Sequence, residues 1–183
     1  MFFKNSLIEQ SILTDTIPSI LPIDFEKIKS NILKNYAYGK NQNDHEWNYL
    51  NNYYHLDDDK NITWIVDYIR DHYRLDCKQR TLVFLDKAGI FQKQNEQINY
   101  HHHLYDYDLE RSPDMSAIVT IDCGETPTIL EFEYQGGRKR HAKWRVSLEK
   151  KQIVLFNSEL RHSFLNNNNK EPTINLSLKF QLI

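Results

Sequence analysis

The second half of the chain is dominated by an alternation of apolar and polar residues. Its last segment, residues 173–182, shows the pattern without interruption, because single polar residues separate Ile174, Leu176 and Leu178. Successive side chains of a β-strand point to opposite faces, so the pattern predicts a strand with one apolar face. Shorter segments of the same kind precede it, at residues 81–85, 98–104, 116–121, 130–134, 144–148, 152–156 and 162–165.

The first part of the chain has the period of a helix instead. Asp24 can cap a helix whose apolar residues lie three and four positions apart, and Gly39 is a suitable end for it. Residues 40–60 are rich in Asn, Asp and Tyr, so we expect a loop there, followed by a second helix. The apolar positions of the two predicted helices are Phe25, Ile28, Ile32, Leu33 and Tyr36, and then Ile62, Ile65, Val66, Ile69 and Tyr73.

About eight short strands separated by turn signals predict a jelly roll, the architecture also called a double-stranded β-helix. The predicted class is mainly β with N-terminal helices (α+β), in which the helices pack on one sheet. We expect residues 1–80 to form a helical N-terminal segment on the barrel. Residues 81–183 would form the double-stranded β-helix domain.

The composition is that of a soluble globular chain. Hydrophobic residues make up 40% and charged residues 26%, and the net charge is −2, so no strong field attracts nucleic acid. Cys77 and Cys123 are far apart and do not suggest a disulfide framework. No stretch reads as a membrane span or a signal peptide. We expect a cytoplasmic protein without a membrane or nucleic-acid partner, and the basic residues 138–145 are interpreted as a hairpin tip.

Three consecutive histidines end one of the predicted strands. On a strand, His101 and His103 share a face and His102 takes the other. A third ligand is needed for a metal ion, and His162 is the best candidate because it begins a later strand. Asp106 is a nearby carboxylate, and two histidines with one carboxylate suit Fe(II). Three histidines would also suit zinc or copper, so the ligands alone do not name the metal.

The segment from residue 99 to residue 180 resembles a family of 2-oxoglutarate-Fe(II) oxygenases that is widespread in marine bacteria and their phages. The family has an H-x-H segment, a strand that begins near a small residue, a segment of the form lvlFPs-l-H-v-pN and a final strand of the form eRisisf. The corresponding stretches of this chain are HHH at 101–103, MSAIV at 115–119, QIVLFNSELRHSFLN at 152–166 and EPTINLSLKF at 171–180.

The resemblance implies a double-stranded β-helix that holds Fe(II) and the cosubstrate 2-oxoglutarate and hydroxylates a small-molecule or peptide substrate. It implies that Thr173, Asn175 and Ser177 line the cosubstrate pocket, while Tyr100, Tyr134 and Phe156 are candidates for the barrel wall. Two departures stand out: the H-x-D motif is absent, and Thr173 occupies the position of the family's cosubstrate-binding Arg. A Thr cannot make the paired charge-assisted bonds of an Arg, so a cation elsewhere would have to act. Lys179, Lys143 and Arg145 are the candidates, and the sequence does not choose among them.

A second resemblance is to the cupins, which share the fold and use H-x-H with a later H-x-x-x-N. Here His162 is followed by Asn166, but the glycines that flank cupin motifs and their Pro-x-Gly are missing. This resemblance implies a metalloenzyme that does not use 2-oxoglutarate. A non-catalytic jelly-roll binding module is the third alternative, favoured by the missing Arg. The sequence is compatible with a homodimer and does not identify the substrate.

Overall fold

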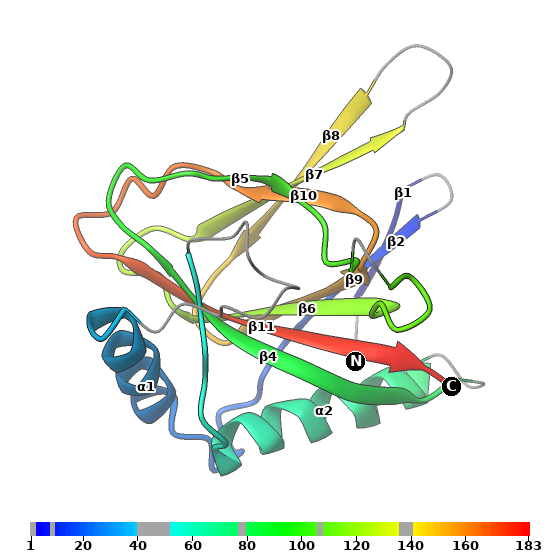
Figure 1. Ribbon diagram of the computed structural model, residues 1–183, viewed down its shortest axis with the longest axis horizontal. Helices are drawn as coiled ribbons and strands as arrows, with labels where there is room; N and C mark the ends of the chain where they lie inside the picture. The colour runs from blue at the N-terminus through cyan, green and yellow to red at the C-terminus, as the bar shows by residue number, and fades with distance from the viewer. Residues whose placement is uncertain (1–2, 8–9, 40–51, 77–79, 106–107, 136–140) are drawn as a thin grey trace.

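Two antiparallel β-sheets lie face to face in the computed structural model (Figure 1), which describes all residues except 1–2, 8–9, 40–51, 77–79, 106–107 and 136–140. The larger sheet has the strand order β1-β2-β9-β6-β11-β4-β3, and the smaller has the order β5-β10-β7-β8. The strands are β1 (Phe3–Leu7), β2 (Gln10–Thr16), β3 (Tyr53–Tyr54), β4 (Leu82–Gln92), β5 (Ile98–His101), β6 (Met115–Asp122), β7 (Thr128–Gln135), β8 (His141–Leu148), β9 (Gln152–Asn157), β10 (Arg161–Phe164) and β11 (Thr173–Leu182).

The strands from β4 to β11 have the connectivity of a jelly roll. β4, β6, β9 and β11 belong to the larger sheet, whereas β5, β7, β8 and β10 form the smaller one. Except at the β7–β8 hairpin, the chain therefore crosses to the other sheet after each strand, and each strand pairs with partners that are distant in sequence. The predicted mainly β jelly roll is confirmed. The predicted strand at residues 173–182 is confirmed with the same bounds.

The sequence analysis expected a helical N-terminal segment. The segment does contain two helices, but it also adds strands to the larger sheet. β1 pairs with β2, β2 pairs with β9, and β3 pairs with β4. The alternation that would reveal β2 is missing because both faces of its sheet are covered. Leu13 packs toward the helices while its neighbour Ile12 packs between the sheets, so two consecutive apolar residues are both buried.

The two helices lie against the outer face of the larger sheet (Figure 1). α1 (Phe25–Ala37) begins after Asp24, whose side chain accepts a bond from the Lys27 amide as expected for a cap. α2 is Lys60–Asp76. The buried faces of both helices share one hydrophobic cluster with β6, β9 and the apolar face of β11. No helix in the described part of the chain combines the length and the apolar character that crossing a membrane requires.

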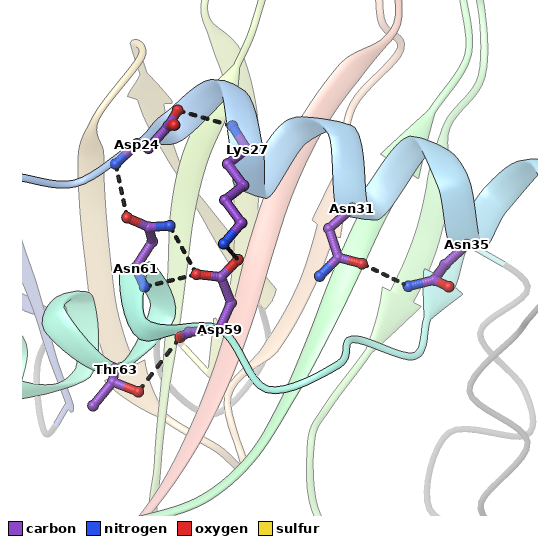
Figure 2. A network of polar contacts seen from close by, with 7 residues as sticks. All are labelled: Asp24, Lys27, Asn31, Asn35, Asp59, Asn61 and Thr63. Atoms are coloured by element: carbon purple, nitrogen blue, oxygen red, sulfur yellow. Dashed lines mark hydrogen bonds and ion pairs between the residues drawn. The ribbon is translucent and has the colours of Figure 1, made fainter.

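A polar network ties the starts of the two helices together (Figure 2). Asn61, at the start of α2, accepts a bond from the Asp24 amide and donates one to the Asp59 carboxylate. Lys27 forms an ion pair with Asp59 at 3.4 Å. Further along α1, the Asn35 side chain donates to the His55 carbonyl oxygen at 2.8 Å. These bonds fix residues 55–61, and so they also fix the way in which β3 enters the larger sheet.

A second hydrophobic cluster fills the space between the two sheets, with Phe132, Phe156 and Phe164 as its largest members besides Tyr53. Because the apolar side chains of β11 face the helices, its polar side chains face this second cluster. Four polar residues of β11 are thereby buried in the interior of the jelly roll: Thr173, Asn175, Ser177 and Lys179.

Candidate metal centre

Three histidine side chains converge between the two sheets. His101 is the last residue of β5, His103 follows two positions later, and His162 lies in β10. Their candidate ligand atoms all lie within 4.8 Å of one another, and all three residues are buried. The pairing of β5 with β10 explains the convergence, since it places His101 directly opposite His162. The sequence analysis predicted this set of residues.

His103 reaches the cluster in a different way from the predicted one. The strand was expected to continue to residue 104, which would place His101 and His103 on one face by alternation. Instead β5 ends at His101, and the His103 amide donates to the Ser158 carbonyl oxygen at 2.9 Å. His103 is held by the loop that precedes β10, and it remains buried while its neighbour His102 is partly exposed.

Backbone carbonyl groups fix the orientation of two of the imidazole rings. Nδ1 of His101 lies 2.8 Å from the Asn99 oxygen, and Nδ1 of His162 lies 3.0 Å from the Leu160 oxygen. Because a carbonyl oxygen only accepts, both Nδ1 atoms carry the proton and both Nε2 atoms keep a lone pair. Nε2 of His162 is buried and has no hydrogen-bond partner among the described residues. Metal-binding histidines have this arrangement, in which the second nitrogen donates to a carbonyl group.

The surroundings keep these histidines neutral. Burial lowers the pKa of His101 to about 4, and it lowers the pKa values of His103 and His162 well below the usual value of 6.5. The charges of the neighbouring histidines and of Lys179 act on His103 in the same direction. Neutral imidazole is the form that binds a metal ion, so the lone pairs are available at physiological pH.

Apolar rings cover the cluster. The Phe156 ring centroid is 4.8 Å from that of His162, and the Phe132 centroid is 5.9 Å away. The prediction that Phe156 forms part of the interior wall therefore agrees with the structure, and Tyr134 packs at the edge of the hydrophobic cluster between the two sheets. Tyr100 lies on the opposite face of its sheet, where its hydroxyl group bonds to Glu131.

Tyr53 is a member of the site that the sequence analysis missed. It belongs to β3, is fully buried, and places its hydroxyl oxygen 2.9 Å from Nε2 of His101 and 3.3 Å from Nε2 of His103. No periodic pattern marks this residue, because it follows an Asn-rich segment and its strand has only two residues.

Lys179 is the buried cation of this interior. Its side chain comes from β11, is fully buried, and places Nζ 4.6 Å from the centroid of the Tyr105 ring. Its positive charge contributes to the lowered pKa values of His101 and His103, so it acts on the histidine cluster. On the same strand, Asn175 Nδ2 and Ser177 Oγ are buried without hydrogen-bond partners among the described residues.

Other candidate residues lie elsewhere. Thr173 donates to Gln92 Oε1 at 2.9 Å and lines a separate cleft of about 270 Å³ that contains none of the three histidines. Arg145 and Lys143 bind Glu131 on the outer face of the smaller sheet. Both side chains therefore lie on the face of the smaller sheet away from the histidines, since β8 directs Val146 and Leu148 inward instead. Asp106 lies outside the described residues.

Comparison with solved structures identifies the fold. The non-heme α-ketoglutarate-dependent carbocyclase SnoK of nogalamycin biosynthesis matches with a TM-score of 0.59 at 8% identity, over 94% of this chain and 79% of its own. A Pseudomonas putida prolyl-4-hydroxylase matches with a TM-score of 0.58 at 15% identity, over 92% of this chain and 87% of its own. The epimerase SnoN, solved with Fe³⁺, α-ketoglutarate and nogalamycin RO, has a TM-score of 0.56 at 11% identity, over 93% and 78% of the two chains.

The chain has the fold of these enzymes. No protein-family model matches the sequence, and no curated protein matches it. At identities of 8–15% the likeness is one of backbone architecture. What the site does must therefore be argued from its own residues.

Proposed function

We propose that this chain is an Fe(II)-dependent oxygenase that uses 2-oxoglutarate to oxidise a small-molecule or peptide substrate. The observation that carries the proposal is the cluster of His101, His103 and His162, three neutral imidazoles buried between the sheets of a jelly roll. The fold supports the same activity, because the matching SnoK is a non-heme α-ketoglutarate-dependent carbocyclase and the matching SnoN structure holds Fe³⁺ and α-ketoglutarate.

The residues fit a transition-metal ion. Nε2 of His162 is buried and has no hydrogen-bond partner among the described residues. In His101, the bond from Nδ1 to the Asn99 carbonyl oxygen leaves the lone pair on Nε2. Buried polar atoms without partners are costly, so a cation at this point would offset that cost. Iron bound here would supply the activation of oxygen that the side chains cannot perform. The role of the protein is to hold the ion and to exclude water with Phe132 and Phe156.

The residues also fit an anionic cosubstrate, although in a different way from the related family. Lys179 provides a buried positive charge next to the histidines, and Asn175 and Ser177 provide polar atoms on the same face of β11. A carboxylate would receive bonds from these groups, with Lys179 acting as a point charge in place of a paired Arg. We therefore assign the cosubstrate role to this row and not to Arg145.

The test is anaerobic loading with Fe(II), followed by measurement of 2-oxoglutarate binding and then of succinate formation after oxygen is added. We expect stoichiometric iron, cosubstrate binding and slow succinate formation without a substrate. Lys179→Met should weaken 2-oxoglutarate binding at least tenfold while it leaves iron bound, because it removes the buried charge and keeps the side-chain volume. Lys87→Met, the same change on the partly exposed face of β4, is the matched control.

One observation favours a second candidate, a metalloenzyme of the cupin type that does not use 2-oxoglutarate. The described ligands are all histidines, and Thr173 stands where the related family has its Arg. This candidate predicts stoichiometric metal with no measurable 2-oxoglutarate binding and no succinate. Failure to bind any transition metal would contradict both candidates and leave a binding module.

A further inference from the structure

We propose that Tyr53 is a fourth protein ligand of the metal, through its phenol oxygen. The proposal rests on the metal centre of the proposed function and adds a ligand of a different chemical type. Tyr53 belongs to the N-terminal segment, far in sequence from the three histidines. Nevertheless, its hydroxyl oxygen contacts Nε2 of both His101 and His103 inside the barrel.

The separations are those of ligands that share one ion. Two atoms bound at about 2.1 Å and at right angles to each other are about 3.0 Å apart, and a tetrahedral angle gives about 3.4 Å. The Tyr53 oxygen lies 2.9 Å from the His101 nitrogen and 3.3 Å from the His103 nitrogen. These separations match those of three atoms that share one ion, so we propose that an ion bound to both nitrogen atoms also binds this oxygen.

The hydrogen bonds show that the Tyr53 hydroxyl group reaches the atoms that would bind the ion. Since Nδ1 of His101 donates to the Asn99 oxygen, Nε2 of His101 can only accept, and the Tyr53 hydroxyl group donates to it. The hydroxyl proton thus occupies the lone pair that a metal ion would use. For a cation to take that place, the phenol must lose its proton to solvent and its oxygen must shift to one side of the lone-pair axis, where it can bind the same ion.

The scaffold around Tyr53 holds it in place from both sides. β3 is paired with β4, where Tyr53 lies opposite Ile90. Asn52, which precedes Tyr53, makes two hydrogen bonds with the backbone of Phe91, both at 3.1 Å. The Asn52 side-chain amide donates to the Phe91 carbonyl oxygen, and the Asn52 carbonyl oxygen accepts from the Phe91 amide. After Tyr53, the His55 carbonyl oxygen is bound by Asn35, and the chain then enters the network of Figure 2. Tyr53 is positioned by secondary structure, as metal ligands usually are.

A phenol oxygen would also change the charge of the site. Three neutral imidazoles leave a divalent ion with its full charge in an apolar interior, which is costly. A metal-bound phenolate lowers that charge by one and is a hard ligand that suits iron. Four protein ligands leave two positions of an octahedral ion, enough for a bidentate 2-oxoacid. Tyr53 would have to withdraw before a second exogenous molecule could bind.

The experiment is absorption and resonance Raman spectroscopy of protein that is loaded with Fe(II) and then oxidised in air without 2-oxoglutarate. We expect a phenolate-to-Fe(III) charge-transfer band in the visible region and tyrosinate vibrations enhanced within it. Tyr53→Phe should abolish the band and raise the dissociation constant for iron about tenfold or more. Tyr54→Phe is the matched control, because Tyr54 packs in the helix-side core, with its ring 5.5 Å from that of Tyr36.

The outcomes separate this proposal from the proposed function. Iron bound at one equivalent without the band, or a band that survives in Tyr53→Phe, overturns the role of Tyr53 and leaves the histidine centre in place. A band that depends on Tyr53, in a protein that forms no succinate, supports the ligand and contradicts the use of 2-oxoglutarate. If the wild type binds no iron, both proposals fail.

Discussion

At the scale of single residues, the site contains polar side chains whose burial is unfavourable unless a partner satisfies them. His162 is fully buried, and its Nε2 has no hydrogen-bond partner among the described residues. A buried polar atom without a partner costs roughly 1–3 kcal/mol. A bound ion, cosubstrate or ordered water would satisfy such an atom, so His162, Asn175 and Ser177 support the proposed function.

His162→Ala tests the histidine set directly. We expect affinity for Fe(II) or Co(II) to fall about 100-fold or more, because one of three imidazole ligands is lost. His102→Ala is the control, since His102 belongs to the same triplet but is partly exposed and outside the cluster. Isothermal titration of each variant gives the comparison. Equal losses of metal affinity in the two variants would contradict binding by the buried cluster.

Glu131 makes a prediction for acid stability. Hydrogen bonds from Tyr100 and Lys143 lower the pKa of this buried carboxyl group to about 2, from an ordinary value of 4.5. A lowered pKa in the folded state stabilises the protein above pH 4.5, and this stability is lost as the pH falls toward 2. The free energy of unfolding of the wild type, measured with urea, should therefore fall by about 1–3 kcal/mol as the pH is lowered over that interval. In Glu131→Gln the free energy of unfolding should start lower and depend less on pH. Parallel curves for the two proteins would refute the assignment.

At the scale of elements, the sequence predicted those strands and helices whose apolar residues recur with a regular period or run together. The helices and β11 follow their periodic patterns, and the positions of His101 and His162 followed from strand alternation and distance in sequence. β2 was missed because its neighbouring apolar residues Ile12 and Leu13 are buried on opposite faces, so that the strand shows no alternation, and β4 was shortened because polar residues and a glycine interrupt it. In β4, residues 86–89 read DKAG, which hides the strand, although Ala88 is fully buried. The two-residue β3 left no pattern, and Tyr53 was missed with it.

Gly89 shows why α1 can lie so close to β4. A Cβ atom at this position would be 2.6 Å from Ile32 Cγ1 and 3.0 Å from Cγ2. Gly89→Ala should therefore lower the free energy of unfolding by about 1–3 kcal/mol, through overpacking. The loss should be smaller in an Ile32→Ala background, where the clashing atoms are gone. Chemical denaturation of the four proteins measures the coupling. Additive effects would show that helix and strand do not meet at this point.

At the scale of the whole molecule, the architecture was predictable but its assembly was not. The number and spacing of strands indicated a jelly roll. The interior position of Lys179 followed from the alternation of β11, whereas the outward position of Arg145 depends on which face of β8 meets the core. Pairings between distant strands decide such questions, and a single sequence does not reveal them. The match to solved structures at TM-scores of 0.56–0.59 supplied the missing framework.

Metal binding should stabilise the entire fold, because its ligands come from strands of different parts of the chain. An ion at a hundred times its dissociation constant adds about 2.7 kcal/mol, provided that the unfolded chain does not bind it. For a domain of this size, that raises the melting temperature by roughly 5–10 °C. Differential scanning fluorimetry with Co(II), with and without a chelator, measures the shift. His162→Ala should show no shift, and an equal shift in that variant would place the ion elsewhere.

The interleaving of the strands has a consequence for synthesis on the ribosome. β4 is made before its neighbour β11, although it lies between β3 and β11 in the sheet, and all the other described strands precede β11 in the chain. No half of the barrel can close on its own, so a nascent chain exposes open strand edges until residues 173–182 arrive. Premature termination within β11 would leave β4 and β6 without the strand that joins them in the larger sheet. Cells that produce this protein would meet such fragments as substrates for proteolysis, not as weakened enzymes.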